Sequence, residues 1–420
     1  MFKFIHAADL HLDSPLRGLE RYPGAPADRL RGATREALEN LVRLALDEQV
    51  QFVVIAGDVY DGDWPDHNTG LYFATQMNRL READVPVLLI AGNHDAANRM
   101  TRTLRLPDNV NVLSNRKPQT VELGNCAAVV HGQSFARQEV WDNLASTYPT
   151  AVRGAFNIGL LHTCATGGSS SHERYAPCSL DDLRSRDYDY WALGHIHQRG
   201  EVLREPLTLF PGNLQGRHIR ETGPKGCLVV EVDDRLQPQA RFEALDVVRW
   251  QRVIIAAKAD EHADDLRLRF ATEMKGAVDE AGDRLLAVRV EIAGACRAHE
   301  QINSQPEQWR SELRAIANEA GSDQAWIEKI ELATQAPADS DAPREGPLAE
   351  LVELVHEYAA QPARLSELAG ELDDLTRKLP ADLREGADAL RLDDPQWLAE
   401  VVRQTEPLLL ARLQSPREAR

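Results

Sequence analysis

The sequence has little of what marks secreted, thiolate-zinc or membrane proteins. Its 420 residues include only five cysteines, which are widely spaced and form no CxxC pair. This argues against a disulfide framework and against a thiolate zinc site, so we expect reduced, mostly buried thiols. No apolar run approaches the ~20 residues that span a membrane, and the amino terminus does not read as a signal peptide. We therefore expect a cytoplasmic protein without a membrane partner.

The chain also lacks excess positive charge, aromatic side chains and a nucleotide-binding loop. Its formal net charge is -18, so a nucleic-acid substrate would have to be attracted by local basic groups and metal ions. An aromatic content of 6% offers no base-stacking platform. Because no GxxxxGK[ST] motif is present, the chain cannot power DNA remodelling by itself. Net acidity alone does not exclude a nucleic-acid substrate.

Apolar strands alternate with helices in the first hundred residues. Residues 2–8, 51–56 and 87–90 are predicted strands, and residues 28–48 and 67–83 are predicted helices between them. This alternation is typical of a parallel sheet whose functional loops lie at the carboxyl ends of the strands. Shorter alternating strands follow, and we expect them to form a second, mixed or antiparallel sheet packed on the first; these cover residues 120–123, 127–132, 156–163, 188–194, 208–211 and 227–232.

The predicted fold class is α/β (α+β), with a two-sheet β-sandwich core flanked by helices. We assign residues 1–240 to a catalytic domain and 241–335 to a small α/β capping domain for DNA or substrate specificity. Residues 336–347, rich in proline and polar side chains, are a predicted linker. Residues 348–420 are expected to be amphipathic helices that pack on the core or bind a partner protein.

Polar side chains gather where the predicted strands end. The set comprises Asp9, His11, Asp58, Asn93, His94, His162, His195 and His197. A donor set of carboxylate, carboxamide and imidazole suits manganese, iron or zinc better than magnesium alone. More ligands are present than one tetrahedral ion needs, so two ions about 3.5–4 Å apart are predicted, a pair suited to in-line attack on phosphorus. Asp58 is the expected bridge, because its strand is predicted between those that carry Asp9 and Asn93.

Other polar residues are open to ordinary structural interpretations. His6 lies within an apolar strand and is expected to be a core histidine, and His131 is expected in a loop or at the surface. For the arginines at 99, 102 and 105, phosphate binding and a solvated helix face are equal alternatives. Arg217, His218 and Arg220 leave the same two alternatives open.

Taken together, the motifs resemble those of a known family. DxH, GD, GNHD, a later histidine and GHIH occur in the order and spacing of the calcineurin-like metallophosphoesterases. The longer strings AADLHLDSP, VIAGDVYD, LLIAGNHD, ALGHIH and FPGN look like those of the SbcD-type DNA repair exonucleases, nearest to the YhaO-like branch. The resemblance covers residues 1 to about 235. Beyond residue 250 it extends only to a general layout of capping domain and helices.

The resemblance implies a division of labour among the polar residues. One ion would be held by Asp9, His11, Asp58 and His197, and the other by Asp58, Asn93, His162 and His195. His94 matches the histidine that assists leaving-group departure, and Asp95 would orient it. Where related chains often read PGS, this one reads Pro211-Gly212-Asn213, which puts phosphate contacts at that loop in doubt.

The leading hypothesis is a two-metal DNA exonuclease or endonuclease, most simply with Mn²⁺. By resemblance, it would be the nuclease subunit of a DNA repair complex with an SbcC-like ABC-type ATPase, and a homodimer is one expected arrangement. One alternative is a small-molecule phosphodiesterase or phosphatase, because the same metals serve both reactions. The other is a DNA-binding scaffold with an inactive site, against which the intact ligand set argues.

Overall fold

The computed structural model describes residues 1–14, 24–61, 68–97, 105–124, 126–165, 175–337, 346–379, 383 and 389–414. These residues form two compact units, one built mainly from Pro26–Trp250 with the amino-terminal strand and the other from Gln251–Arg420. Most of the predicted linker, residues 338–345, lies outside the described residues, as do Arg99 and Arg102. In the described part, no helix is both long and apolar enough to cross a membrane.

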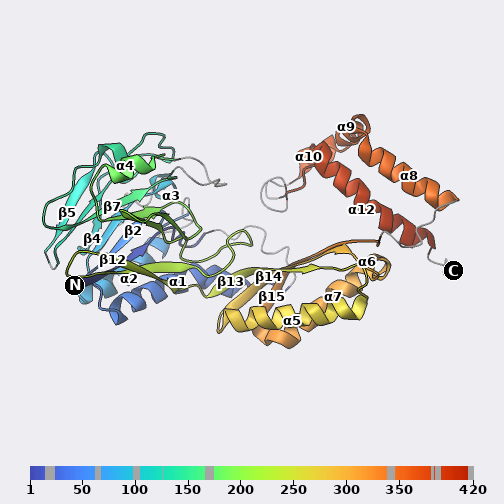
Figure 1. The fold of residues 1–420 in the computed structure, drawn as a ribbon, viewed down its shortest axis with the longest axis horizontal. Coiled ribbons are helices and arrows are strands. Elements are labelled where there is room, and N and C mark those ends of the chain that lie inside the picture. Colours follow the sequence, from blue (N-terminus) through green and yellow to red (C-terminus); the bar gives the residue numbers. More distant parts are fainter. Residues whose placement is uncertain are drawn as a thin grey trace. The chain divides into compact units, whose positions relative to one another are not determined.

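Two six-stranded sheets form the first unit (Figure 1). In order across the first sheet, the strands are β12 (Pro238–Ala244), β11 (Gly226–Val232), β1 (Phe2–Ala7), β2 (Phe52–Ala56), β3 (Val87–Ile90) and β4 (Val110–Val112). The second sheet runs β5 (Gln119–Leu123), β6 (Ala128–Gly132), β7 (Phe156–His162), β8 (Tyr190–Gly194), β10 (Leu207–Phe210) and β9 (Gly200–Leu203). Each sheet has four neighbouring parallel strands; antiparallel pairing extends the first sheet at one edge, through β11 and β12, and the second sheet at both edges, through β5 and β9. The predicted mixed sandwich is confirmed.

Strand β11 corrects one prediction. Residues 227–232 were expected in the second sheet, but β11 pairs antiparallel with β1 of the first sheet. The strand is buried almost throughout, so its apolar pattern does not distinguish which sheet it joins. A second correction concerns His131, which is fully buried within β6 and not in a loop.

The sandwich core follows from the alternation of side chains along the strands. On β2, Phe52 and Val54 face the second sheet, while Val53 and Ile55 face the helices that cover the first sheet. These covering helices are α1 (Ala27–Asp47) and α2 (Asn68–Glu82). On its other side, the second sheet is covered by a cluster with Trp191 that includes α4 (Leu180–Arg184) and the short helix η3 (Ala145–Thr147). The central strands of both sheets are therefore buried on both faces.

The interior polar groups fit this core. His6 is fully buried between the sheets, with Nδ1 2.9 Å from the Tyr190 hydroxyl and Nε2 3.0 Å from the Leu193 carbonyl oxygen, which confirms the predicted core histidine. The five cysteines form no disulfide, and four of them are buried. The short helix α3 (Asn93–Ala97) is separated from the end of β3 by two residues, so Asn93 and His94 lie in a helical turn and not in the predicted loop.

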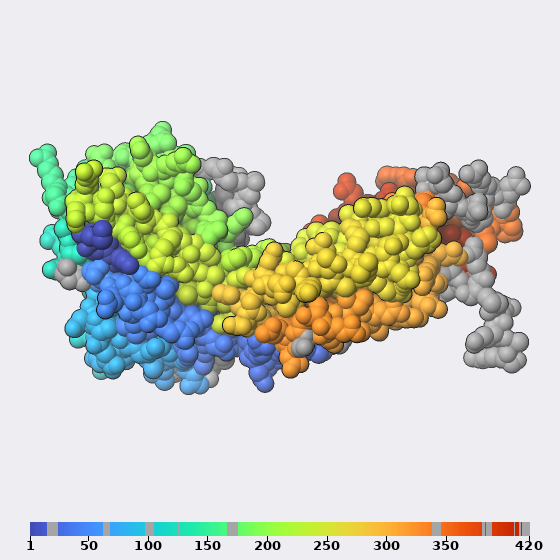
Figure 2. All heavy atoms as spheres, turned by 60° about the horizontal axis from the view of Figure 1, so that its bottom comes forward, coloured from blue at the N-terminus to red at the C-terminus, as the bar shows by residue number. Residues whose placement is uncertain are grey.

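The second unit begins with a three-stranded sheet. Its elements are β13 (Val248–Ala256), α5 (Ala263–Ala281), β14 (Leu285–Ala295), α6 (His299–Ser304), α7 (Pro306–Gly321), the short helix η4 (Ser322–Gln324) and β15 (Ala325–Gln335). The predicted β-α-β-α-β alternation is present, with α6 as an additional helix. Helices α5 and α7 contact one another and share a core with the sheet; in Figure 2 they form an outer face of this unit, in yellow and orange.

The carboxyl-terminal helices are α8 (Pro347–Ala360), α9 (Pro362–Glu371), α10 (Asp373–Lys378) and α12 (Pro395–Gln414). Helix α12 contacts α8 and α9 through a small core that includes Leu365 and Leu398, and it also contacts α6. Leu408, Leu409 and Leu413 are exposed on α12. Helices are therefore present where the sequence predicts them, and the role of these helices stays a prediction.

Candidate metal centre

The polar side chains predicted as metal ligands lie at adjoining strand ends of the two sheets. Asp9 and His11 follow β1, Asp58 follows β2, Asn93 follows β3, His162 ends β7, and His195 and His197 follow β8. Three overlapping groups have ligand atoms within 4.8 Å of one another: Asp9, His11 and His197; His11, Asp58 and His94; and Asp58, His162 and His195. The structure thus brings together residues from distant parts of the sequence.

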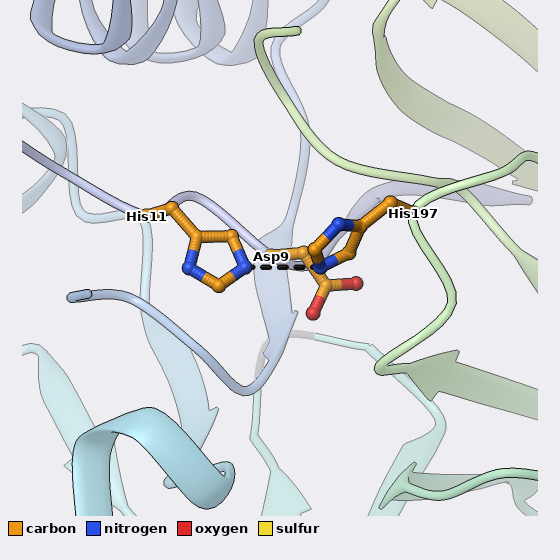
Figure 3. Close-up of side chains that lie close together, drawn as sticks. All are labelled: Asp9, His11 and His197. Carbon is orange, nitrogen blue, oxygen red and sulfur yellow. Dashed lines mark hydrogen bonds between the residues drawn. The ribbon is translucent and has the colours of Figure 1, made fainter. Parts of the chain in front are cut away.

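The first group contains two imidazoles that face each other (Figure 3). The Nε2 atoms of His11 and His197 are 3.1 Å apart, beside the Asp9 carboxylate. His197 Nδ1 lies 2.8 Å from Glu221 Oε1, so this nitrogen donates and Nε2 of the neutral ring carries a lone pair. Two nitrogens that bind one ion at about 2.1 Å would lie roughly 3 Å apart. The observed spacing therefore fits a shared cation.

Asn93 adjoins the group formed by Asp58, His162 and His195. His162 Nδ1 donates to the Ala56 carbonyl oxygen at 2.9 Å, which leaves a lone pair on Nε2 of the neutral ring. That Nε2 lies 3.0 Å from Asn93 Oδ1 and 3.4 Å from Asp58 Oδ2, both of which are oxygen acceptors. A divalent cation among these atoms would satisfy all three. Asn93 thus lies where the second predicted ligand set requires it.

Asp58 lies in two of the three groups, one with His11 and one with His162 and His195. Its strand β2 lies between β1 and β3, as predicted from the sequence. The carboxylate is 1% exposed, and Oδ1 also accepts a hydrogen bond from the His94 backbone amide at 3.0 Å. Both halves of the candidate centre therefore meet at this side chain.

The electrostatics of the centre favour bound cations. Burial raises the pKa of Asp9 to about 6, because the histidines around it offset only part of the desolvation. Burial would also raise the pKa of Asp58, but the adjacent His162 outweighs it and the net shift is downward. Burial lowers the pKa of His11 well below its ordinary value, which keeps the ring neutral and able to bind metal. Burial lowers the pKa of His162, but the Asp58 carboxylate outweighs it and raises this pKa to about 9, so a cation bound at this ring would take the place of its proton. Buried carboxylates beside imidazoles match the donor types of a dimetal site.

Backbone strain is concentrated at the same residues. Asp9, His11, Asp58 and His195 have positive φ angles of 51°, 44°, 52° and 101°. Residues other than glycine rarely adopt this conformation, which costs of order 1–3 kcal/mol each and persists where the surrounding structure enforces it. Gly92 is needed for a different reason: a Cβ there would collide with Asp58 Oδ1 and lie 2.8 Å from His162 Cε1. The glycine of GNHD therefore leaves room for ligands from two other strands.

His94 lies beside this centre but is oriented by a residue that the sequence did not indicate. Its Nδ1 is 2.9 Å from Asp61 Oδ1. Asp95, predicted to orient His94, is buried and accepts hydrogen bonds from the backbone amides of Val59, Tyr60 and Gly92 at 3.2, 3.0 and 3.1 Å. The predicted role of Asp95 in orienting His94 stays a prediction, while the contact found at the His94 ring is that of Asp61. Asp95 links the loop after β2 to the loop after β3, and Asp61 contacts the His94 imidazole.

Glu221 is a further residue that the sequence did not indicate. It is 5% exposed, and its carboxylate accepts hydrogen bonds from His197 Nδ1 at 2.8 Å and from Asn213 Nδ2 at 2.9 Å. Arg217 donates to it through the backbone amide at 2.8 Å and through the guanidinium at 2.7 Å. Burial opposes ionisation of Glu221, but Arg217 outweighs it and the pKa falls well below its ordinary value.

This arrangement bears on Arg217 alone among the three basic residues of the loop after β10, and the alternatives for His218 and Arg220 stay open. The Arg217 guanidinium is neither solvated nor directed to a substrate phosphate, because it bridges Glu221 and Asp61, the latter at 3.0 Å. His218 and Arg220 are exposed, as is Arg105. Asn213, the departure from PGS, is fully buried and supports Glu221. The only local sequence signal for this network is the Arg217 to Glu221 spacing of four residues.

Comparison with known proteins agrees with this geometry. Residues 2–199 match the calcineurin-like phosphoesterase family, and residues 250–335 match the middle domain of the metallophosphoesterase YhaO. The chain is 35% identical to the uncharacterized metallophosphoesterase YhaO of Bacillus subtilis over 60% of its length and 62% of that protein. It is 23% identical to a subunit of the nuclease SbcCD of Staphylococcus epidermidis, over 60% of this chain and 72% of that one.

A third relative is the DNA double-strand break repair protein Mre11 of Sulfurisphaera tokodaii, with 26% identity over 47% of this chain and 49% of that protein. The chain thus spans less than two thirds of the length of the Bacillus and Sulfurisphaera relatives. The segment that matches the calcineurin-like phosphoesterase family includes every predicted metal ligand of the candidate centre.

Proposed function

Because this chain belongs to the calcineurin-like metallophosphoesterases, in their YhaO-like family, we propose that it hydrolyses phosphodiester bonds of DNA with two divalent metal ions. The observation that carries the proposal is that the Asp58 carboxylate lies within ligand distance of His11 on one side and of His162 and His195 on the other. One ion would be held by Asp9, His11, Asp58 and His197, and the other by Asp58, Asn93, His162 and His195. Manganese is the favoured ion, because the donors are carboxylate, carboxamide and imidazole.

When bound, such ions lower the pKa of an attacking water and offset the charge of the phosphate oxygens. The protein's own contribution at the leaving group would come from His94. Its Nδ1 donates to Asp61, so Nε2 is the nitrogen left to face a departing oxygen. Burial lowers the pKa of His94, but Asp61 and Asp58 outweigh it and the net shift is upward, which favours the proton-donating form.

The position of His94 is fixed from two directions. Its backbone amide donates to Asp58 at 3.0 Å, so the proton donor is tied to the proposed bridging ligand. Asp61 is itself held by the Ser14 hydroxyl at 2.5 Å and by Arg217 at 3.0 Å. The donor therefore lies in a defined place relative to both ion sites, as protonation of a leaving group requires.

DNA is proposed as the substrate on two grounds. The relatives that the chain resembles include a nuclease subunit and a DNA break repair protein. The chain also carries a second unit after residue 250, which a small substrate does not need. The test is incubation of the chain in manganese with end-labelled linear and hairpin DNA, beside a small generic phosphodiester, with Asp58→Ala as the control.

Metal-dependent cleavage of DNA that is lost in Asp58→Ala would support the proposal. Cleavage of the small diester alone would refute the DNA assignment and favour a small-molecule phosphodiesterase or phosphatase. Absence of all hydrolysis in manganese would favour an inactive DNA-binding scaffold.

The exposed leucines of α12 are the proposed contact for a partner ATPase of the SbcC type. Leu409 and Leu413 are 37% and 60% exposed, so replacing both by glutamate removes apolar surface without opening the core around Leu398. The double variant should fail to co-purify with the ATPase while keeping hydrolysis of a small diester. Glu400→Lys, at another exposed site on α12, is the matched control. Unchanged co-purification of the double variant would refute the assignment.

A further inference from the structure

One tryptophan beside the metal centre is left exposed to solvent. Trp141 lies in the segment between β6 and β7 and is 55% exposed. In the described part of the chain, every other tryptophan, tyrosine and phenylalanine is buried or half-buried. Removing a large aromatic side chain from water is energetically favourable. An exposed aromatic side chain at the edge of a functional site therefore suggests a ligand that covers it.

Two ring contacts connect Trp141 to the centre. Its ring centroid is 5.2 Å from that of Tyr175, with the planes inclined at 55°. Tyr175 is buried, and its ring centroid is 6.0 Å from that of His195, a proposed ligand of the second ion. The same segment also places Phe135 with its ring centroid 5.4 Å from that of His162. The segment therefore lies along the half of the centre formed by His162 and His195.

The segment is anchored on both sides of the tryptophan. Val140 is 5% exposed, and its carbonyl oxygen accepts a hydrogen bond from the Ala176 backbone amide at 2.6 Å. Leu144 and Tyr148 are buried in the same cluster, and Tyr148 donates to the Leu160 carbonyl oxygen of β7 at 2.8 Å. The indole thus projects from a fixed backbone, and its position does not depend on a substrate to order the loop.

We propose that Trp141 stacks on a nucleobase of the substrate next to the phosphate that is cleaved. The inference rests on the proposed DNA nuclease function and narrows its substrate to strands or ends with unpaired bases. Bases inside a duplex are stacked on both faces, whereas an unpaired base has a free face, and stacking on an aromatic side chain does not depend on its identity. The low aromatic content of the chain does not exclude a stacking platform, because one exposed ring suffices.

The experiment compares three replacements at one position. Trp141→Phe keeps an aromatic face, Trp141→Leu keeps apolar volume without one, and Trp141→Ala removes both. Each is assayed in manganese on a single-stranded oligonucleotide and on an abasic strand of the same length. Leu71→Ala, at a 57% exposed position on α2, is the surface control. Circular dichroism and manganese binding confirm that each variant is folded and loaded.

For the base-bearing strand, the leucine and alanine variants should raise KM about 5- to 150-fold with kcat little changed. The phenylalanine variant should recover most of the loss, and the abasic strand should be cleaved equally by all variants. If leucine and phenylalanine behave alike, or if the abasic strand is affected as strongly as the normal one, the stacking assignment is wrong. Failure of the wild-type chain to cleave any DNA would instead refute the proposed function on which the inference rests.

Discussion

Replacing Glu221 by glutamine tests whether the carboxylate behind His197 prepares the metal ligands. Glu221 Oε1 accepts from His197 Nδ1 and from the Arg217 guanidinium, and Oε2 accepts from the Arg217 backbone amide and from Asn213. Glutamine has the same size but only one acceptor oxygen. In either orientation its amide nitrogen faces two donors. If the amide nitrogen takes the place of Oε1, His197 Nδ1 loses its acceptor and the ring loses its fixed tautomer; if it takes the place of Oε2, His197 keeps only an uncharged acceptor while Asn213 and the Arg217 amide lose theirs. We expect weaker support of His197 in both cases, with the fold kept.

The expected size of the effect follows from these contacts. Removing the hydrogen-bond partner of a metal-binding histidine costs roughly 10- to 100-fold in metal affinity or activity, or about 1.4–2.7 kcal/mol. The loss of folding stability should be smaller than the ~3–5 kcal/mol of a fully broken buried ion pair. Arg217 keeps Asp61, at 3.0 Å, as a charged partner. Metal binding should therefore suffer more than stability.

Manganese titration by calorimetry and chemical denaturation of the metal-free chain measure the two quantities separately. Glu231→Gln is the matched control, because Glu231 is a half-buried glutamate on β11 that pairs with Lys3 and is remote from the centre. The control should bind manganese like the wild type. Wild-type manganese affinity and activity in folded Glu221→Gln would show that the carboxylate does not support His197 in this way.

Three further predictions concern the same unit. Gly92→Ala should leave the chain folded but abolish metal binding, as measured by metal analysis of the purified variant, because the added methyl group displaces Asp58 and the His162 ring. His94→Ala should keep its metal, also by metal analysis, and lose hydrolysis of substrates with poor leaving groups. Burial lowers the pKa of His6 to about 3, so the folded state binds fewer protons there than the unfolded state, and stability should fall as the pH decreases from about 6.5 toward 3. In denaturation of the metal-free chain, His6→Gln should reduce this slope by up to about 1.4 kcal/mol per pH unit, and an unchanged slope would contradict the assignment.

The ligands at the strand ends could be predicted because each one has a recognisable local sequence pattern. An apolar strand followed by a short polar motif is visible without knowledge of the partners, as at Asp9, Asp58 and Asn93. The carboxyl ends of parallel strands meet at one edge, so the residues after them meet too. The candidate centre was accessible to sequence reasoning for this reason.

The supporting residues could not be found in the same way. Glu221 lies in an irregular segment. Its role arises only because the fold brings its carboxylate into contact with His197. Asp61 and Asp95 are equally plausible neighbours of His94 in the sequence, and only the fold decides between them. The placement of β11 failed for a related reason: apolar alternation predicts a strand and carries no information on which strand will pair with it.

Trp141 illustrates the limit of composition. A low overall aromatic content suggested that no stacking surface exists, yet a single ring contributes according to its place and exposure. Neither the position nor the exposure of the Trp141 ring could be deduced from its neighbours in the sequence.

Under the proposed function, seven side chains hold two divalent ions that share Asp58. The most direct measurement is the number of manganese ions bound per chain, by equilibrium dialysis followed by metal analysis of the wild type and Asp58→Ala. We expect two ions for the wild type and a clear loss in Asp58→Ala, accompanied by loss of hydrolysis. One ion or none in the wild type, or two ions in Asp58→Ala, would contradict this assignment.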